Sequence, residues 1–226
     1  MQKMSMSIII PSCRAYSDCW TPFVRLFKKY WPNCKYPLYL MTDRVDEPWL
    51  GDGVNMTEVD LGWSQNLYHN LNRVKDPLVL MLLDDFFLTE EVDKEFIDRA
   101  VRRMWLYKDV VCTRLAPCPG PDYHCYNDVG VIDSNAPYKV STQAAIWRKD
   151  ALQEILTKTD SAWSFETEGT KLKTEGVFLS AYREKHWPLN YLISGINRGK
   201  WNPDAISICK KNGVNIDLSR RQVDSK

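Results

Sequence analysis

Short apolar runs alternate with amphipathic stretches through the first half of the chain. We expect strands at residues 7–11, 37–43, 55–61, 78–83 and 110–115, where apolar and β-branched residues cluster between turn signals. Apolar residues recur at helical spacing in three intervening segments, 19–31, 64–74 and 93–105. This order predicts an α/β, Rossmann-like domain in which helices flank a mostly parallel central sheet.

The second half of the chain has a less regular pattern. Residues 117–130 (PCPGPDYHCYNDVG) contain three prolines and two glycines and predict a long loop. After this loop we expect a strand over 138–147, a helix over 148–156, an aromatic turn over 161–169 and a helix near 174–185.

Two adjacent aspartates end the most apolar strand. Residues 78–91 read LVLMLLDDFFLTEE, so Asp84 and Asp85 follow six apolar residues and precede two phenylalanines. A turn or a helix cap is one interpretation. However, burying two carboxylates without a cation is costly, and ligands of open α/β sheets bind beyond the carboxyl ends of the strands. Ser12 and Asp43 are predicted at such ends as well. Mg²⁺ and Mn²⁺ prefer carboxylate oxygens and bridge them to phosphates.

Two further segments carry candidate chemistry. In SAWSFETEG (161–169), Glu166 follows aromatic residues, and a carboxylate in a partly apolar pocket suits a general base; Glu168 is the competing candidate. In ISGINRGKWNPD (193–204), Arg198 and Lys200 flank a glycine, so they suit a diphosphate clamp, although an ordinary basic loop has the same composition.

Composition excludes several classes of protein. The 226-residue chain has a net charge of +1, so no global field draws it to nucleic acid or membrane, although the segment from Arg198 onward has a local excess of four positive charges. Seven cysteines in a chain of this length indicate reduced thiols. The apolar runs are too short for a transmembrane segment and the N-terminus lacks a signal peptide, which predicts a cytoplasmic protein. The sequence contains no P-loop, GxGxxG or GxSxG motif.

Three sequence blocks in order resemble one family. WSQNLYHNLNRVKDPLVLMLLDDFFL (63–88), YKVSTQAAIWRKDALQEIL with SAWSFETEG (138–169), and GINRGKW (195–201) are similar to glycosyltransferases of the GT-A fold. The likeness is greatest to short sugar transferases of bacterial surface-polysaccharide loci and their phage relatives, and it covers roughly residues 7–202.

The resemblance implies a single GT-A-like domain with a nucleotide-sugar-binding half (1–116), an acceptor and catalytic half (117–202) and a polar basic tail (203–226). Asp84 and Asp85 match the metal-binding acidic motif, although they read Asp-Asp-Phe in place of Asp-x-Asp. Glu166 matches the catalytic base. The implied donor-binding residues are Pro11, Ser12, Asp43, Trp63, Arg198 and Lys200. The implied cofactor is Mn²⁺ or Mg²⁺, and the implied donor is a nucleoside-diphosphate sugar.

The function expected on this basis is metal-dependent, inverting sugar transfer to an acceptor hydroxyl, in the cytoplasm of a bacterium or a phage-infected cell. A surface glycan is the first choice of acceptor, and a hydroxymethylated DNA base is the alternative. Nucleotidyl transfer would require a Gly- and Lys-rich loop after the first strand. Residues 11–20 (PSCRAYSDCW) contain no glycine, and Arg14 is their only basic residue. A non-catalytic sugar-binding module would tolerate loss of the acidic residues.

Overall fold

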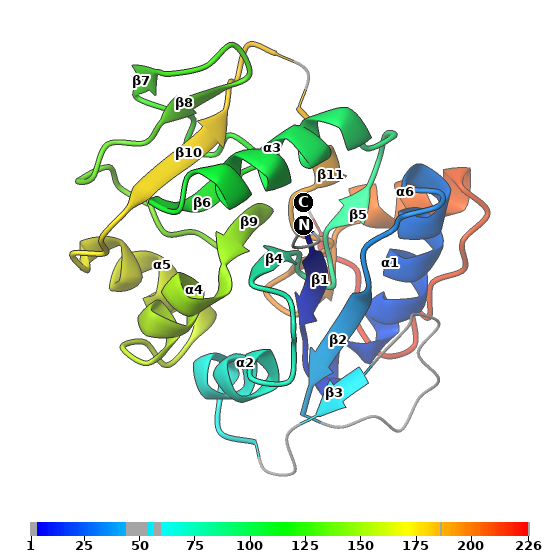
Figure 1. The fold of residues 1–226 in the computed structure, drawn as a ribbon. Helices are drawn as coiled ribbons and strands as arrows, with labels where there is room; N and C mark the ends of the chain where they lie inside the picture. The colour runs from blue at the N-terminus through cyan, green and yellow to red at the C-terminus, as the bar shows by residue number, and fades with distance from the viewer. Residues whose placement is uncertain (1–3, 44–53, 57–59, 186, 226) are drawn as a thin grey trace.

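A nine-stranded sheet forms the middle layer of the protein, described in a computed structural model for residues 4–43, 54–56, 60–185 and 187–225 (Figure 1). The strand order is β3-β2-β1-β4-β9-β6-β10-β8-β7. Only β8 and β9 run against the other strands, as the pairings require, so the predicted mostly parallel sheet is confirmed. The strands are β1 (Met6–Pro11), β2 (Leu38–Thr42), β3 (Val54–Met56), β4 (Leu78–Met81), β6 (Val110–Arg114), β7 (Tyr123–His124), β8 (Val129–Val131), β9 (Ala145–Arg148) and β10 (Val177–Ala181).

Helices cover both faces of this sheet. One core contains side chains of α1 (Ser17–Tyr30), α3 (Lys94–Leu106) and α6 (Pro203–Lys211), and the other contains those of α2 (Trp63–Leu71), α4 (Lys149–Leu156) and α5 (Ala162–Thr167). Successive residues of the central strands alternate between the two cores: Ile8 and Ile10 enter the first, and Ile9 enters the second. The unbroken apolar runs in the sequence are therefore strands buried on both faces.

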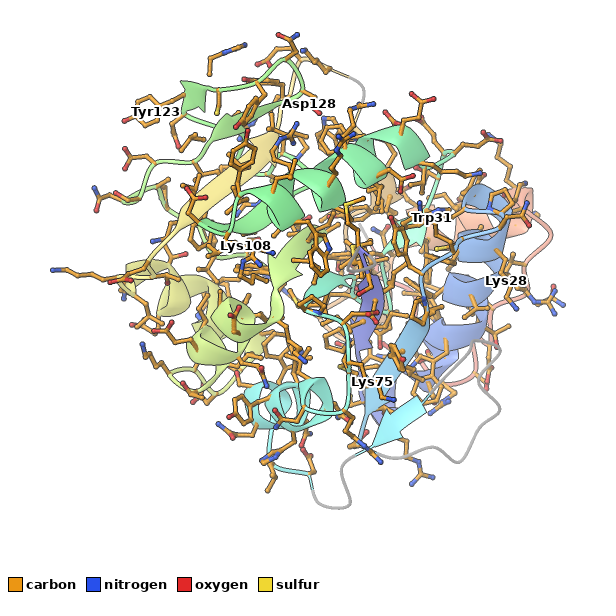
Figure 2. The ribbon with its side chains drawn as sticks, viewed as in Figure 1. Lys28, Trp31, Lys75, Lys108, Tyr123 and Asp128 are labelled. Atoms are coloured by element: carbon orange, nitrogen blue, oxygen red, sulfur yellow. The ribbon has the colours of Figure 1, made fainter. Side chains whose placement is uncertain are left out.

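Local sequence explains where α3 begins. Asp93 is the N-cap, and its carboxylate accepts a hydrogen bond from the backbone N–H of Phe96 at 2.8 Å. The stripe predicted for this segment is buried, including Ile97, Ala100 and Met104. On the polar side, Arg103 pairs with Asp128 at 2.7 Å, which ties the helix to the turn before β8. Asp128 is labelled in Figure 2.

The expected helix near 174–185 is wrong. Residues Val177–Ala181 form β10, which pairs in parallel with β6 and antiparallel with β8. Gly176 directly precedes the strand with φ +113°, and a Cβ there would lie 2.5 Å from Val111 Cγ1, so the close approach to β6 requires glycine. The spacing of apolar residues fits either element, and pairing with distant strands decides between them.

The expected aromatic turn over 161–169 is also wrong, because Ala162–Thr167 form α5. A capping box starts this helix: the Ser161 hydroxyl accepts from the Ser164 N–H at 3.1 Å, and the Ser164 hydroxyl accepts from the Ser161 N–H at 2.9 Å. The reciprocal bonds satisfy N–H groups that would otherwise lack a partner, which offsets the poor helix propensity of the aromatic residues.

The predicted loop over 117–130 contains the hairpin β7–β8. Arg114, at the end of β6, is almost fully buried, and its guanidinium donates hydrogen bonds to the carbonyls of Pro119, Tyr138 and Lys139 at 2.7–2.9 Å. The side chain of Arg114 thus fixes both ends of the segment 119–139 to the end of β6.

Short elements complete the fold. They are η1 (Arg14–Tyr16), η2 (Gly169–Lys171), the pair β5 (Phe87–Leu88) with β11 (Tyr191–Leu192), and the hairpin β12 (Ile196–Asn197) with β13 (Lys200–Trp201). Among the described residues, every helix is too short or too polar to span a bilayer.

Candidate active site

A cavity of about 390 Å³ opens at the carboxyl ends of β1, β2 and β4. Five of the sequence-predicted residues line it together: Pro11, Ser12, Trp63, Asp84 and Asp85. The parallel strands carry four of these residues to one edge of the sheet, and the start of α2 supplies Trp63. The cavity also receives Tyr16, Asn66 and Ala162 from the neighbouring helical segments.

Asp84 is held by a short hydrogen-bonded chain. Its side chain is buried, with the residue 6% exposed, and its Oδ2 accepts a hydrogen bond from the Ser12 hydroxyl. The Ser12 oxygen in turn accepts from the Trp20 indole N–H at 2.7 Å. Sequence reasoning assigned Trp20 only to the apolar stripe of α1, because nothing in the helical spacing indicates where its N–H points.

Asp85 is held by a turn from the far end of the chain. The residue is 7% exposed; its Oδ2 accepts from the backbone N–H of Ile196 at 3.2 Å, and its carbonyl accepts from the N–H of Gly195 at 3.0 Å. A Cβ at Gly195 would lie 3.0 Å from that same carbonyl oxygen. Position 195 therefore favours glycine, because a side chain would push the turn away from Asp85.

The electrostatics of the two carboxylates favour a bound cation. Burial, and then the charge of Asp85, raises the pKa of Asp84 well above its ordinary value, while the Ser12 hydrogen bond opposes this shift. Burial also raises the pKa of Asp85, against the bond from Ile196. Within the part of the chain that the structure describes, neither carboxylate forms an ion pair. A cation in the cavity would remove this repulsion.

The two carboxylates fit a metal ion that also binds phosphate oxygens better than a metal ion enclosed by protein ligands alone. The described residues contain no group of three or more His, Cys, Asp or Glu side chains that could hold a metal ion. Mg²⁺ and Mn²⁺ are often bound by one or two carboxylates, with phosphate oxygens and water completing the coordination. Asp84 and Asp85 in an open cavity match that arrangement.

The indole of Trp63 also lines the cavity. Trp63 starts α2 and packs on Phe165 of α5, with ring centroids 5.5 Å apart. Gly62, with φ +87°, precedes it, and the carboxylate of Asp60 accepts from the Gly62 N–H at 2.9 Å and from the Asn66 amide at 2.8 Å. These bonds fix the start of α2 and hence the position of the indole.

Asp43 lies at the end of β2 and does not line the cavity. Its carboxylate accepts from the backbone N–H of Arg14 at 2.7 Å and from the Thr42 hydroxyl at 3.0 Å. The observed role of Asp43 is therefore to hold the loop between β1 and α1, whose residues Ser12 and Tyr16 do line the cavity.

Glu166 does not line the cavity; it lies on α5, one turn after the cavity residue Ala162, and its carboxylate is held by hydrogen bonds. Its Oε1 accepts three hydrogen bonds, from the Ser141 hydroxyl at 2.9 Å and from the N–H and hydroxyl of Thr142 at 2.8 Å each. Glu168, the competing candidate, is exposed and pairs with Lys171 at 2.9 Å. Glu166 is thus the better held of the two carboxylates.

Arg198 and Lys200 belong to the β12–β13 hairpin and do not line the cavity. Arg198 and Gly199 form its turn with φ +48° and +78°, the left-handed conformation that two-residue hairpin turns require. The hairpin directly follows Gly195 and includes Ile196, so its two cations are carried on the element that holds Asp85.

The chain matches no protein-family model and no curated protein in sequence. Its fold, however, is similar to solved structures. TarS from S. aureus superimposes with a TM-score of 0.54 at 13% identity, over 96% of this chain and 41% of that chain. TarS 1-349 in complex with UDP gives a TM-score of 0.52 at 13% identity, over 96% of this chain and 67% of that chain.

A cytidylyltransferase from Leptospira borgpetersenii superimposes with a TM-score of 0.52 at 11% identity, over 99% of both chains. At these identities the likeness concerns the fold, and the chain spans less than half of the full TarS chain. The protein therefore has the GT-A-like α/β fold that its sequence resemblance implied, and it shares this fold with the structures named above.

Proposed function

We propose that the protein is a metal-dependent glycosyltransferase that moves a sugar from a nucleoside-diphosphate sugar to an acceptor hydroxyl with inversion. The observation that carries this proposal is the pair Asp84–Asp85: two adjacent, buried carboxylates with raised pKa values and no ion-pair partner among the described residues, facing a cavity at the strand ends. Asp84 and Asp85 would hold Mn²⁺ or Mg²⁺, whose charge would offset that of the carboxylates and of a diphosphate.

Each wall of the cavity has a role in this proposal. Trp63, Tyr16, Pro11 and Ser12 line the cavity, and we assign the nucleoside of the donor to them. When bound, a divalent cation supplies the charge that stabilises the departing diphosphate. Arg198 and Lys200 lie outside the cavity lining, on the hairpin that holds Asp85, and would have to turn toward the cavity to pair with that diphosphate. Asp43 acts indirectly, by fixing the loop that carries Ser12 and Tyr16.

Glu166 is proposed as the base. It takes the proton of the acceptor hydroxyl as that oxygen bonds to the anomeric carbon; the bond from this carbon to the diphosphate breaks, and its electron pair leaves with the nucleoside diphosphate. The three donors on Oε1 fix the carboxylate and leave Oε2 as the oxygen that receives the proton. The proposed acceptor is a surface glycan, because a net charge of +1 is low for a DNA-binding enzyme.

Nucleotidyl transfer is the second candidate, because the Leptospira borgpetersenii cytidylyltransferase matches over 99% of both chains. The loop from Ser12 to Tyr16 argues against it. This loop contains no glycine and one cation, Arg14, whereas a triphosphate needs close backbone approach and more positive charge.

One experiment separates the two candidates. The protein is titrated with nucleoside diphosphates, triphosphates and nucleotide sugars, with and without Mn²⁺, and its melting temperature is recorded. A ligand at a hundredfold excess over its Kd stabilises by about 2.7 kcal/mol, or about 5–10 °C for a domain of this size. The proposal expects a Mn²⁺-dependent shift with one diphosphate or nucleotide sugar, and release of nucleoside diphosphate upon turnover.

Asp85→Asn provides the site variant, and Glu91→Gln is the matched control because it removes an exposed carboxylate nearby. We expect the Mn²⁺-dependent shift to vanish in the first variant and to persist in the second. Release of pyrophosphate from a nucleoside triphosphate would instead establish nucleotidyl transfer. A shift that persists in Asp85→Asn would remove the acidic pair from the site.

A further inference from the structure

The C-terminal segment returns to the candidate active site after α6. Arg221 forms a two-pronged ion pair with Asp18 in the first turn of α1: its Nε lies 2.6 Å from Oδ2, and its Nη2 lies 2.9 Å from Oδ1. The side chains are 9% and 0% exposed, respectively. Arg221 also donates to the carbonyl of Ala15. Terminal residues are ordered in this way only when specific contacts hold them.

The same guanidinium covers part of the cavity wall. Its central carbon lies 4.6 Å from the ring centroid of Tyr16, a residue that lines the cavity beside Asp84. Arg220 adds a hydrogen bond to the Ser17 hydroxyl at 2.7 Å. The loop that supplies Ser12 to Asp84 is therefore bounded on its outer side by the C-terminal segment.

The next residues of this segment attach to the other side of the acidic pair. The N–H of Trp201 donates to the carbonyl of Gln222 at 2.9 Å, and the N–H of Asp224 donates to the carbonyl of Trp201 at 2.9 Å. Trp201 pairs with Ile196 across the β12–β13 hairpin, and the Ile196 N–H binds Asp85. Residues 220–224 thus contact residues 15–18, which follow Ser12, on one side and Trp201, which pairs with Ile196, on the other.

We infer that residues 220–224 form a strap that fixes both walls of the Asp84–Asp85 pair, with Arg221 as its positioning residue. The strap contributes to the separation of the two walls, because it is bonded to residues of α1 and the loop before it on one side and to Trp201 of the hairpin on the other. Its effect on cation binding rests on the function proposed above; its effect on the two walls does not.

The charge of Arg221 and its contacts with the cavity walls predict opposite effects on metal binding when the residue is replaced. Removing a cation near two carboxylates would tighten binding of a metal ion if charge alone mattered. Loss of a residue that orients metal ligands weakens metal binding, by about tenfold or more. Variants that preserve net charge therefore isolate the positioning role. Arg221→Lys keeps the charge without the planar fork, and Asp18→Asn combined with Arg221→Gln removes one charge of each sign.

The test compares these two variants with Lys211→Ala, which changes an exposed cation on α6. Amide hydrogen exchange is measured on peptides that cover 12–16 and 194–197, and Mn²⁺ binding is measured on the same samples by the loss of the free-ion paramagnetic signal. We expect faster exchange in both peptides and about tenfold weaker Mn²⁺ binding in the two strap variants, with wild-type behaviour in the control.

Unchanged exchange in either peptide would overturn the strap, as would faster exchange with tighter or unaltered Mn²⁺ binding. If the wild-type protein binds no Mn²⁺, the metal part of the proposed function fails. In that case amide hydrogen exchange alone tests the strap. Faster exchange in both peptides supports it, and unchanged exchange refutes it.

Discussion

Glu166→Gln separates the two roles that the structure allows for this residue, support of the loop before β9 and proton acceptance. The carboxylate oxygen receives three hydrogen bonds of 2.8–2.9 Å from Ser141 and Thr142. A hydrogen bond to a charged group contributes about 1.5–3 kcal/mol, and one between neutral groups about 0.5–1.5 kcal/mol. An amide oxygen in the same place therefore loses about 1 kcal/mol per bond.

The expected loss of stability is smaller than the sum over three bonds, because Glu166 is partly exposed and solvent screens its charge. We expect the free energy of unfolding to fall by about 2 kcal/mol, which corresponds to about 4–8 °C in melting temperature for a chain of this size. If Glu166 is also the base, turnover falls by about 10²–10⁴, far more than a change in stability of this size produces in a protein that remains folded.

Urea unfolding and single-turnover sugar transfer measure the two effects on one preparation. Glu168→Gln is the matched control: this carboxylate is exposed, and its pair with Lys171 contributes less than about 1 kcal/mol. Lower stability with normal turnover would mean that Glu166 supports the loop before β9 and is not the base. Wild-type values of both quantities would refute the whole reasoning, and loss of turnover in Glu168→Gln alone would transfer the catalytic role to that residue.

Three further predictions concern the cavity and its surroundings. The raised pKa of Asp84 means that the folded protein binds a proton at this carboxylate more tightly than the unfolded chain does. The free energy of unfolding therefore falls as pH rises above about 4 and through the folded-state pKa. In urea unfolding with EDTA present, Asp84→Asn should be more stable than wild type at pH 7, and its stability should depend less on pH. Gly195→Ala should weaken Mn²⁺ binding by about tenfold, measured by titration, because its Cβ would lie 3.0 Å from the carbonyl of Asp85; unaltered binding would show that the turn can shift freely. Arg114→Met leaves three carbonyls without their donor and should cost about 3 kcal/mol in urea unfolding; a cost below about 1 kcal/mol would mean that the 117–139 segment does not depend on this side chain.

The sheet and the residues at its edge follow from local sequence more readily than the contacts that hold them. Strands such as 78–81 are recognisable because an apolar run buried on both faces has few other uses. Once they are parallel, their carboxyl ends must meet, which is why Ser12 and Asp84 lie in one cavity. The β10 segment was misassigned because Val177 and Ala181 have a spacing that a helix also uses.

Local sequence does not predict the contacts that surround the acidic pair, for a physical reason. Ile196 is 111 positions from Asp85, and Arg221 is 203 positions from Asp18. No periodicity connects such residues; only the folded topology brings them together. A backbone N–H donor such as that of Ile196 cannot be predicted from the pattern of side chains. The indole of Trp20 can pack in the core, donate a hydrogen bond or do both, and its position in the helical spacing does not distinguish among these roles.

The reversal of β9 has a consequence for the geometry of the reaction. Strands β1, β2 and β4 leave the sheet at the cavity edge, whereas β9 enters the sheet there, since Ala145 pairs with Met81 near the end of β4. The segment arriving at β9 carries Ser141 and Thr142, the partners of Glu166. One inverted strand thus brings an incoming loop beside the outgoing ones, and in the reaction proposed above the donor would lie against the outgoing loops and the acceptor against the incoming one.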